Sequence, residues 1–388
     1  MPKILPYLQI YDYSILLILL LATALRFYHL DQQSLWSDEG NSVALTHASF
    51  AQIAARTAFD IHPPFYYWLL KGWVSFWGGT EFALRALSAS LGVLLIALII
   101  RLGRDVAADS VGLAAGFVAA LTPFQVYYAQ ETRMYMLLTL LAAASVWLAL
   151  RCWQTGPPHR GVWLGYALVV ALGLYTQYAF PLMLAVINGT ALIVLWQRKS
   201  RLLAWLGWQA IPLLLYLPWL PIAFRQITTW PSLIEVAAPA HVAQTLMQIL
   251  SLGVSASVVP YIWVLILWGL TGFGLFAAWR WSLQVQRSWA WLLLGGWLIL
   301  PAGMTALLFR PAYLKIFLIA SPAWCLLLGL GIVHLGRWGR YIPLLTTMLV
   351  AIPAASSLNA TYHDSAFQRD NYRAIATFIE AVAAPTTR

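Results

Sequence analysis

The sequence is short of charge and of cysteine. Only 9% of its 388 residues are Asp, Glu, Lys or Arg, whereas 61% are hydrophobic and 21 are tryptophan. Soluble domains carry about 25% charged residues, so the composition excludes an ordinary soluble protein and indicates a polytopic membrane protein. The two cysteines, Cys152 and Cys325, lie far apart and provide neither a disulfide framework nor the ligand spacing of a zinc site.

Several common catalytic signatures are also missing. The chain has no Walker A loop, no G-x-G-x-x-G turn, no G-x-S-x-G, no H-E-x-x-H and no C-x-x-C. Nucleotide binding and the commonest hydrolase arrangements are therefore not expected. The formal net charge of +10 must be interpreted by the position of each basic residue in the membrane, and we expect membrane lipids, but no nucleic acid, as partners.

Long apolar runs dominate the chain instead. A membrane-spanning helix needs roughly 17 to 25 residues, and eleven runs approach this length, at about 13–29, 82–101, 111–128, 134–151, 161–177, 181–197, 203–222, 258–279, 288–309, 313–333 and 341–357. The sequence thus predicts an all-α polytopic membrane protein with about eleven transmembrane helices. No small-residue cleavage site follows the first run, so we expect a retained span and not a signal peptide.

The segment 62–78, HPPFYYWLLKGWVSFWG, is ambiguous because it has the length of a twelfth span. If it lies flat and the N-terminus is cytoplasmic, twelve Lys and Arg residues and only three acids fall on the cytoplasmic side, as the positive-inside rule requires. The sequence therefore predicts an interfacial helix opened by Pro63 and Pro64. We expect a multi-pass protein of the inner (plasma) membrane whose N-terminus is cytoplasmic and whose C-terminus and active site are extracytoplasmic.

One domain is expected over residues 1–388, because no internal repeat or low-complexity stretch is visible. The predicted first extracytoplasmic loop, 30–81, contains one surface helix near 40–55 and the interfacial helix 62–78. A second extracytoplasmic region is predicted at 223–257. From about 358 to 388 we expect a short extracytoplasmic tail and no sizeable soluble domain.

The first group of candidate residues is LWSDEG, residues 35–40, shortly after the first span. Ser37 or Asp38 can cap the helix that follows, where acidic side chains are favoured by the helix dipole. Capping accounts for one carboxylate but leaves Glu39 and the flanking Trp36 unexplained. We therefore consider Asp38 and Glu39 as catalytic candidates.

A second group is DIHPP, in which His62 is held extended before two prolines. His62 is either an idle surface histidine or a phosphate or metal contact, and Asp60 is its nearest potential co-ligand. Lys71, which interrupts the apolar helix that follows, is a further candidate for substrate binding. No ligand spacing commits these residues to a metal, so a divalent metal remains an open possibility.

Two more groups pair charge with apolar spans. In QETRMY, Glu131 and Arg133 form either a local ion pair or a substrate-binding pair, because ionisable groups at a membrane are costly without a partner. In FRPAYLKIF, Arg310, Tyr313 and Lys315 form a basic and aromatic cluster. These cations are either snorkelling anchors or an anion site, since arginine binds phosphate through two parallel hydrogen bonds and lysine adds a point charge.

These stretches together resemble the membrane glycosyltransferases of the GT-C fold. The motifs that carry the resemblance occur in the family order: LWSDEG, HPPFYYWLLKGW, GGTEFALRALSA, YYAQETRMY and RPAYLKIFLIASPA. The nearest types are bacterial enzymes related to protein O-mannosyltransferases, the aminoarabinose transferases of lipid A and the RgtA-like family. The similarity covers most of the chain.

The resemblance implies an enzyme that moves a sugar from a polyprenyl monophosphate carrier to a glycolipid, glycan or protein acceptor. The first-loop acid of the family falls on Asp38, which would act as general base in a single inverting displacement. Glu39 would orient Asp38 or the acceptor, and Glu131 matches a second acidic position that binds a sugar. Arg133, Arg310 and Lys315 are the candidates for stabilising the phosphate.

The sequence departs from the family at two places. Aminoarabinose transferases carry an acid and a lysine before the proline, where this chain has Ile61 and His62, so we expect His62 to take the phosphate role or to bind a metal with Asp60. Many relatives continue into a soluble domain after the YRAIATFIE-like helix. Here we expect the acceptor to be recognised without that domain or through a partner.

A transporter or flippase for lipid-linked sugars is the alternative function. Transporters place charges near the middle of broken helices and show repeated halves. In this sequence the ionisable residues cluster at the ends of the spans and no repeat is visible, which favours the enzyme.

Overall fold

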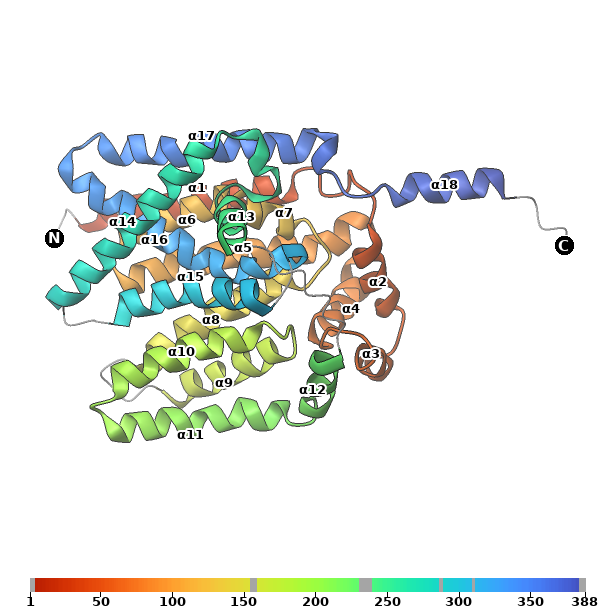
Figure 1. Cartoon of the computed structure of the whole chain (residues 1–388), viewed down its shortest axis with the longest axis horizontal. Coiled ribbons are helices and arrows are strands. Elements are labelled where there is room, and N and C mark those ends of the chain that lie inside the picture. The colour runs from red at the N-terminus through yellow and green to blue at the C-terminus, as the bar shows by residue number, and fades with distance from the viewer. Residues whose placement is uncertain (1–3, 154–158, 230–238, 286–288, 309–310, 384–388) are drawn as a thin grey trace.

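The computed structural model describes residues 4–153, 159–229, 239–285, 289–308 and 311–383. Within these ranges the chain forms helices joined by turns and contains no β-strand. Most of the long helices run side by side along the long axis of the molecule, so the fold is a helical bundle (Figure 1). The predicted all-α class is confirmed.

The bundle is built from apolar helices. Their bounds are α1 Ile4–Phe27, α5 Glu81–Val106, α6 Asp109–Leu121, α7 Pro123–Ala129, α8 Tyr135–Trp153, α9 Arg160–Leu174, α10 Phe180–Leu195, α11 Lys199–Tyr216, α14 Tyr261–Val285, α15 Trp289–Leu308, α16 Ser321–Leu335 and α17 Ile342–His363. The other elements are α2 Ser37–Thr46, α3 Phe50–Thr57, α4 Phe65–Trp77, α12 Leu220–Thr229, α13 Pro239–Leu252, α18 Tyr372–Val382 and the 3-10 helices η1 Gly253–Val258, η2 Pro311–Ala320, η3 Gly336–Trp338 and η4 Ser365–Phe367.

Five stretches are long and apolar enough to cross a membrane: α5, α8, Tyr261–Arg280, Lys315–Trp338 and α17. Two bent pairs, α6 with α7 and α11 with α12, raise this number to seven if each pair forms one span. The apolar helices α9 and α10 and the stretch Trp289–Met304 are shorter. Ten of the eleven apolar runs predicted from the sequence overlap an α-helix or a bent pair of the bundle, and the run at 313–333 overlaps η2 followed by α16. The chain is a multi-pass membrane protein.

A bend of 60° separates α6 from α7 at Thr122 and Pro123. Pro123 has no backbone N–H, so the carbonyl of Ala119, one turn earlier, loses its helical donor. The fully buried Arg26 of α1 replaces that donor. Its Nη2 donates to the Ala119 carbonyl at 3.1 Å and its Nη1 to the Ala120 carbonyl at 3.1 Å. A buried arginine inside the bundle is therefore explained by an opened helix.

Glycines bring α14 and α16 into close contact. A Cβ added at Gly274 would lie 1.8 Å from the carbonyl oxygen of Leu327, and one at Gly331 would lie 2.5 Å from that of Leu270. Small residues allow such close approach between membrane helices. The contact fixes α16 in the centre of the bundle, and with it the preceding η2, which carries Lys315.

The two ends of the bundle are different. At the end where α5 and α8 finish, Asp105 accepts hydrogen bonds from Arg101 and Arg151, and the Arg104 guanidinium lies 5.6 Å from the ring of Tyr11 in α1. The short helices α2, α3, α4 and α12 gather at the opposite end, from which α18 projects (Figure 1). Arg101, Arg104 and Arg151 are three of the twelve bases that the charge count assigned to the cytoplasmic side.

The first loop contains three helices where the sequence predicted two. The prediction of a single helix near 40–55 is wrong, because a new helix starts after Ser49. The Oγ of Ser49 accepts from the Gln52 N–H at 3.2 Å, and Gln52 Oε1 accepts from the Ser49 N–H at 2.9 Å. This reciprocal capping box begins α3 at Phe50. The helix expected at 62–78 is α4, which begins after Pro64. The last apolar run, expected to end near 357, continues as α17 to His363.

Candidate active site

Asp38 stands in the first turn of α2, at the end of the bundle that the short helices cover. Its Oδ2 lies 3.0 Å from Nζ of Lys315 and 3.8 Å from Nη2 of Arg133. The Asp38 side chain is 31% exposed, whereas that of Arg133 is 6% exposed. The fold thus joins an accessible carboxylate to two cations from distant parts of the sequence, all three of which the sequence had selected.

Glu39, the neighbouring acid, is completely buried. Its Oε2 lies 2.7 Å from Nη2 of Arg85, and its Oε1 accepts from Arg85 Nε at 2.9 Å and from the backbone N–H of Thr132 at 2.8 Å. Burial alone would raise the pKa of Glu39, but the hydrogen bond and charge of Arg85 hold it below its usual value. The Glu39 carboxylate therefore ties α2 to α5 and to the turn before α8.

Arg85 is a site residue that the sequence reasoning missed. Beyond its pair with Glu39, its Nη1 donates to the carbonyls of Leu30 and Gln33 at 3.0 and 2.6 Å, and its Nη2 donates to the Ser34 carbonyl at 2.9 Å. These bonds fix the loop that leads into α2. An arginine one turn inside an apolar run requires a partner, and this signal was present in GGTEFALRALSA.

Arg133 anchors the other side of Asp38. Its Nη1 donates to the backbone carbonyl of Asp38 at 3.1 Å and to Oγ of Ser42 at 3.1 Å. Burial lowers the pKa of Arg133, but the nearby Tyr67, Tyr135, Asp38 and Glu131 raise it further than burial lowers it. Arg133 is consequently a fixed positive charge that holds α2 in place.

Lys315 lies between Asp38 and two aromatic rings. Its Nζ is 5.6 Å from the centroid of the Trp36 ring and 5.2 Å from that of Tyr135, distances at which a cation is attracted to the ring face. The side chain is 21% exposed. Lys315 can therefore exchange its contact with Asp38 for a contact with an incoming anion while the rings still stabilise it.

Glu131 is 1% exposed, and its Oε2 has no hydrogen-bond partner in the described part of the chain. Burial raises the pKa of Glu131, and the charge of Glu39 raises it further. Arg369, Lys315 and Arg133 act in the opposite direction. A buried carboxylate without a direct partner is costly, so this side chain is available for a polar ligand.

His62 is also buried, and its Nδ1 lacks a hydrogen-bond partner among the described residues. Burial, followed by the charges of Arg133 and Lys315, places the pKa of His62 well below its usual value. The imidazole is therefore neutral at physiological pH. The charges of Arg133 and Lys315, the two cations beside Asp38, both act on this imidazole.

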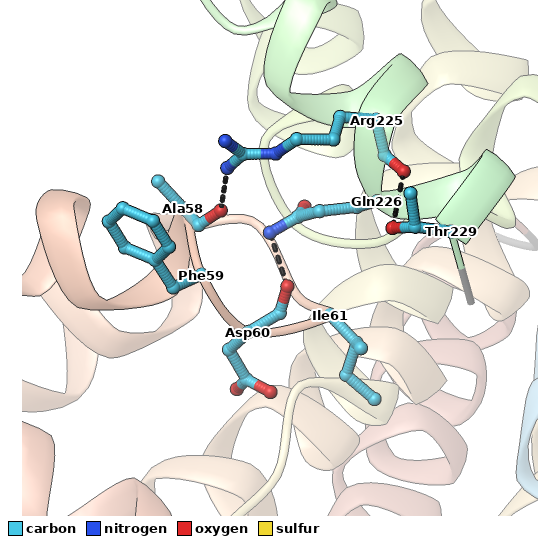
Figure 2. A pocket seen from close by; sticks show the side chains of 7 residues that line it. All are labelled: Ala58, Phe59, Asp60, Ile61, Arg225, Gln226 and Thr229. Carbon is cyan, nitrogen blue, oxygen red and sulfur yellow. Dashed lines mark hydrogen bonds between the residues drawn. The ribbon is translucent and has the colours of Figure 1, made fainter. Parts of the chain in front are cut away.

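Asp60 and Lys71 lie away from this cluster. Asp60 lines a hollow of about 380 Å³ between the turn at residues 58–61 and α12 (Figure 2). There, Arg225 Nη2 donates to the Ala58 carbonyl at 2.6 Å, and Gln226 Nε2 donates to the Asp60 carbonyl. Lys71 Nζ donates to the Thr46 carbonyl at 2.9 Å, which joins α4 to the end of α2.

The remaining predictions concern a metal and two residues near Lys315. Within the described ranges, no three His, Cys, Asp or Glu side chains lie close enough together to hold a metal ion, so Asp60 and His62 find no third ligand there. His62 also faces two cations, which would repel a metal. Arg310 lies outside the described residues, and the structure describes only the backbone of Tyr313, within η2.

Buried polar atoms without a hydrogen-bond partner in the described ranges concentrate around Asp38. They include Trp36 Nε1, His62 Nδ1, Glu131 Oε2, Thr132 Oγ1, Arg133 Nε and Arg369 Nε. Each unsatisfied buried group costs about 1–3 kcal/mol, so a cluster of them is expected where a polar ligand completes the bonding. One accessible carboxylate, two cations and several free donors suit proton removal from a hydroxyl beside a departing anion.

Comparison with known proteins supports the predicted family. Residues 61–222 match the family model described as dolichyl-phosphate-mannose-protein mannosyltransferase. This region contains His62, Glu131 and Arg133, whereas Asp38 and Lys315 lie outside it. No curated protein sequence matches the chain.

Solved structures match nearly the whole chain. ArnT from Cupriavidus metallidurans, bound to undecaprenyl phosphate, is 19% identical with a TM-score of 0.63, over 95% of this chain and 69% of that one. The apo oligosaccharyltransferase of Archaeoglobus fulgidus is 12% identical with a TM-score of 0.69, over 97% of this chain and 58% of that one. Archaeal AglB from the same organism, in complex with an inhibitory peptide and a dolichol-phosphate, is 13% identical with a TM-score of 0.62, over 97% of this chain and 58% of that one.

These likenesses confirm the predicted GT-C fold and do not favour the transporter or flippase alternative. The chain spans less than two thirds of the length of the archaeal structures.

Proposed function

We propose that the chain is an inverting glycosyltransferase, which moves a sugar from a polyprenyl monophosphate carrier to a hydroxyl of a lipid, glycan or protein. The observation that carries the proposal is the contact of the accessible Asp38 carboxylate with Lys315 and Arg133. A base and cations side by side match a reaction in which an acceptor loses a proton while a phosphate leaves. The mannosyltransferase family model over residues 61–222 and the solved structures with undecaprenyl phosphate and dolichol-phosphate support the same class of donor.

The reaction is a single displacement. Asp38 accepts the proton of the acceptor hydroxyl, the acceptor oxygen forms a bond to the anomeric carbon, and the bond from that carbon to the phosphate oxygen breaks. The polyprenyl phosphate leaves with the electron pair. Because the new bond forms on the face opposite the leaving group, the anomeric configuration inverts.

Lys315 lies where it can contact both Asp38 and the donor. Its ammonium lies 3.0 Å from Asp38 Oδ2. A donor phosphate attracts the ammonium away from Asp38, and the electrostatic attraction to the leaving oxygen grows as its charge develops. The neutral His62 adds a hydrogen-bonding group facing the same cations.

The other predicted residues fit supporting roles in this proposal. Glu39, predicted with Asp38 as catalytic, acts by positioning, because both its oxygens are bound by Arg85, Thr132 and Trp36. Glu131 accepts a hydroxyl of the donor or acceptor sugar. Lys71 supports the site by joining α4 to α2, and Arg310 and Tyr313 remain candidates for the phosphate side.

The orientation in the membrane follows from charge. The site on α2 lies at the opposite end of the bundle from the last turns of α5 and α8 (Figure 1). These turns carry Arg101, Arg104 and Arg151, and basic residues mark the cytoplasmic side. We therefore place the active site and the C-terminus outside the inner (plasma) membrane. A donor carried by a lipid suits this location, because it is presented from within the bilayer.

Reconstitution into liposomes tests the function. Purified protein is mixed with total envelope extract, which supplies polyprenyl-phosphate sugars together with lipid, glycan and protein acceptors, and mass spectrometry follows the lipids and the acceptors. The proposal predicts loss of a polyprenyl-phosphate sugar, gain of free polyprenyl phosphate and a glycosylated acceptor. Movement of intact polyprenyl-phosphate sugar between the leaflets without release of polyprenyl phosphate would instead identify a flippase.

A further inference from the structure

A hollow of about 380 Å³ lies between α12 and the turn that follows α3 (Figure 2). Residues 58–61 line one side, and Arg225 and Gln226 of α12 line the other. Gln226 joins the two sides, because its Nε2 donates to the Thr57 carbonyl at 2.7 Å. Pockets for small ligands have volumes of about 300–1,000 Å³. The hollow therefore has the size of a binding site, and it shares no residue with the Asp38 cluster.

Helix α12 has the pattern of a helix that lies at a membrane surface. It follows the apolar helix α11 after a bend of 77°. Leu220, Phe224 and Ile227 share one face and are each at least half exposed, whereas Gln226, on another face, is buried. A helix with one apolar and one polar face lies in the plane of the membrane interface. Phe59, on the other side of the hollow, is exposed as well, as expected for a hollow that opens at the bilayer surface.

Two opposite charges line the hollow without pairing with each other. Asp60 is exposed, and within the described ranges its carboxylate accepts no hydrogen bond and forms no ion pair. The Arg225 guanidinium lies 5.3 Å from the centroid of the Phe59 ring, and its Nη2 donates to the Ala58 carbonyl at 2.6 Å. Across the same part of the chain, no carboxylate pairs with Arg225. A ligand can therefore use both a carboxylate and a guanidinium.

This combination of charges favours a zwitterion. A single ion would compensate either Asp60 or Arg225 and leave the other unpaired. A ligand with an ammonium and a phosphate compensates both through charge-assisted hydrogen bonds, which are the strong ones, and a planar guanidinium fits a phosphate. Phospholipids with an ethanolamine headgroup carry these two groups, and they reach the hollow from the bilayer surface.

We propose that the hollow binds the headgroup of phosphatidylethanolamine. Asp60 accepts hydrogen bonds from the ammonium, Arg225 donates to the phosphate, and the acyl chains lie against the exposed apolar face of α12. The turn at 58–61 leads directly to His62, so the bound lipid joins α12 to the edge of the candidate active site. The inference goes beyond the proposed function and does not depend on sugar transfer.

Lipid binding to the detergent-solubilised protein tests the inference. Native mass spectrometry measures the Kd for phosphatidylethanolamine, phosphatidylcholine and phosphatidylglycerol with the same acyl chains. The wild type should bind phosphatidylethanolamine most tightly, because the choline ammonium has no N–H to donate and the glycerol headgroup has no cation. Asp60→Asn should raise the Kd for phosphatidylethanolamine about fivefold, as for an exposed ion pair, and abolish its preference over phosphatidylcholine.

Arg225→Gln should weaken the binding of all three lipids, because each contains a phosphate. Arg225→Lys, which keeps the charge, should retain the preference for phosphatidylethanolamine. Asp31→Asn and Arg56→Gln are the matched controls, since both residues are exposed charges of the first loop that do not line the hollow. Both controls should bind the three lipids as the wild type does.

Equal Kd values of the wild type for the three lipids would overturn the inference, as would a wild-type preference in Asp60→Asn. The Asp60 side chain makes no polar contact within the described ranges, so this variant is expected to fold, and its unfolding midpoint checks that it does. Glycerophosphoethanolamine, which has the headgroup without acyl chains, should compete only weakly with the lipid. Competition as strong as that of the lipid would assign the hollow to a soluble zwitterion and overturn the proposed membrane ligand.

Discussion

Glu39 and Arg85 form an ion pair sealed from water. Glu39 Oε2 lies 2.7 Å from Arg85 Nη2, and the two side chains are 0% and 2% exposed. Arg85 also donates to the carbonyls of Leu30 and Ser34, so the pair holds the loop before α2 against α5. Of the two adjacent acids, Glu39 fixes the position of α2, whereas the Asp38 side chain remains accessible.

Glu39→Gln should destabilise the protein strongly. Removing one partner of a buried ion pair leaves an uncompensated charge, which costs about 3–5 kcal/mol. The measurement is the thermal unfolding midpoint of the detergent-solubilised protein. Glu81→Gln is the control, because Glu81 and Arg373 form a partly exposed pair worth about 0–1 kcal/mol. Similar small shifts in both variants would contradict the structural role of Glu39.

Lys315→Gln should weaken binding of lipid phosphate. Hydrogen bonds to charged groups contribute about 1.5–3 kcal/mol, so we expect the Kd for undecaprenyl phosphate in detergent to rise by roughly 10- to 150-fold. Lys199→Gln, at the start of α11, provides a charge-matched control and should bind as the wild type does. An unchanged Kd in Lys315→Gln would remove Lys315 from the phosphate site.

His62 should make the fold sensitive to acid. Its pKa is well below the usual value in the folded state, whereas an unfolded histidine titrates near about pH 6.5. The unfolded state therefore binds the proton first, so stability is unaffected above pH 6.5 and falls as the pH drops below it toward the folded pKa. Unfolding midpoints between about pH 7 and pH 5 should decline less in His62→Asn than in the wild type. His47→Asn, at an exposed histidine, is the control and should decline as the wild type does. A decline in His62→Asn equal to that of the wild type would refute the prediction.

The bundle could be predicted from the sequence because membrane spans depend on local composition. Each apolar run overlaps a helix, a bent pair or, at 313–333, η2 followed by α16, and the charge of the short loops distinguished the two ends of the bundle. The helix near 40–55 was mispredicted because Ser49 and Gln52 form a capping box within it. A run that looks continuous in hydrophobicity can still be divided by two hydrogen bonds.

The cluster of Asp38, Arg133 and Lys315 could also be selected from the sequence. Arg133 and Lys315 are charges at the ends of apolar runs, and Asp38 belongs to a pair of acids at the start of the helix that follows the first run. Their distances could not, because they depend on the packing of helices far apart in the chain. Arg85 and Arg369 were missed for the same reason: their partners Glu39 and Tyr127 come from other elements. Sequence identifies which charges are costly, and only the fold identifies what compensates them.

The assignment of Asp38 as the base is tested most directly by Asp38→Asn in the liposome assay. Asparagine keeps the size of the side chain but cannot accept the proton, and general base catalysis contributes about 10²–10⁴-fold. We predict that release of polyprenyl phosphate by Asp38→Asn falls by at least about 100-fold, while its unfolding midpoint stays close to that of the wild type. Asp31→Asn, a control at an exposed acid in the same loop, should keep activity close to the wild type. Wild-type release by Asp38→Asn would contradict the account.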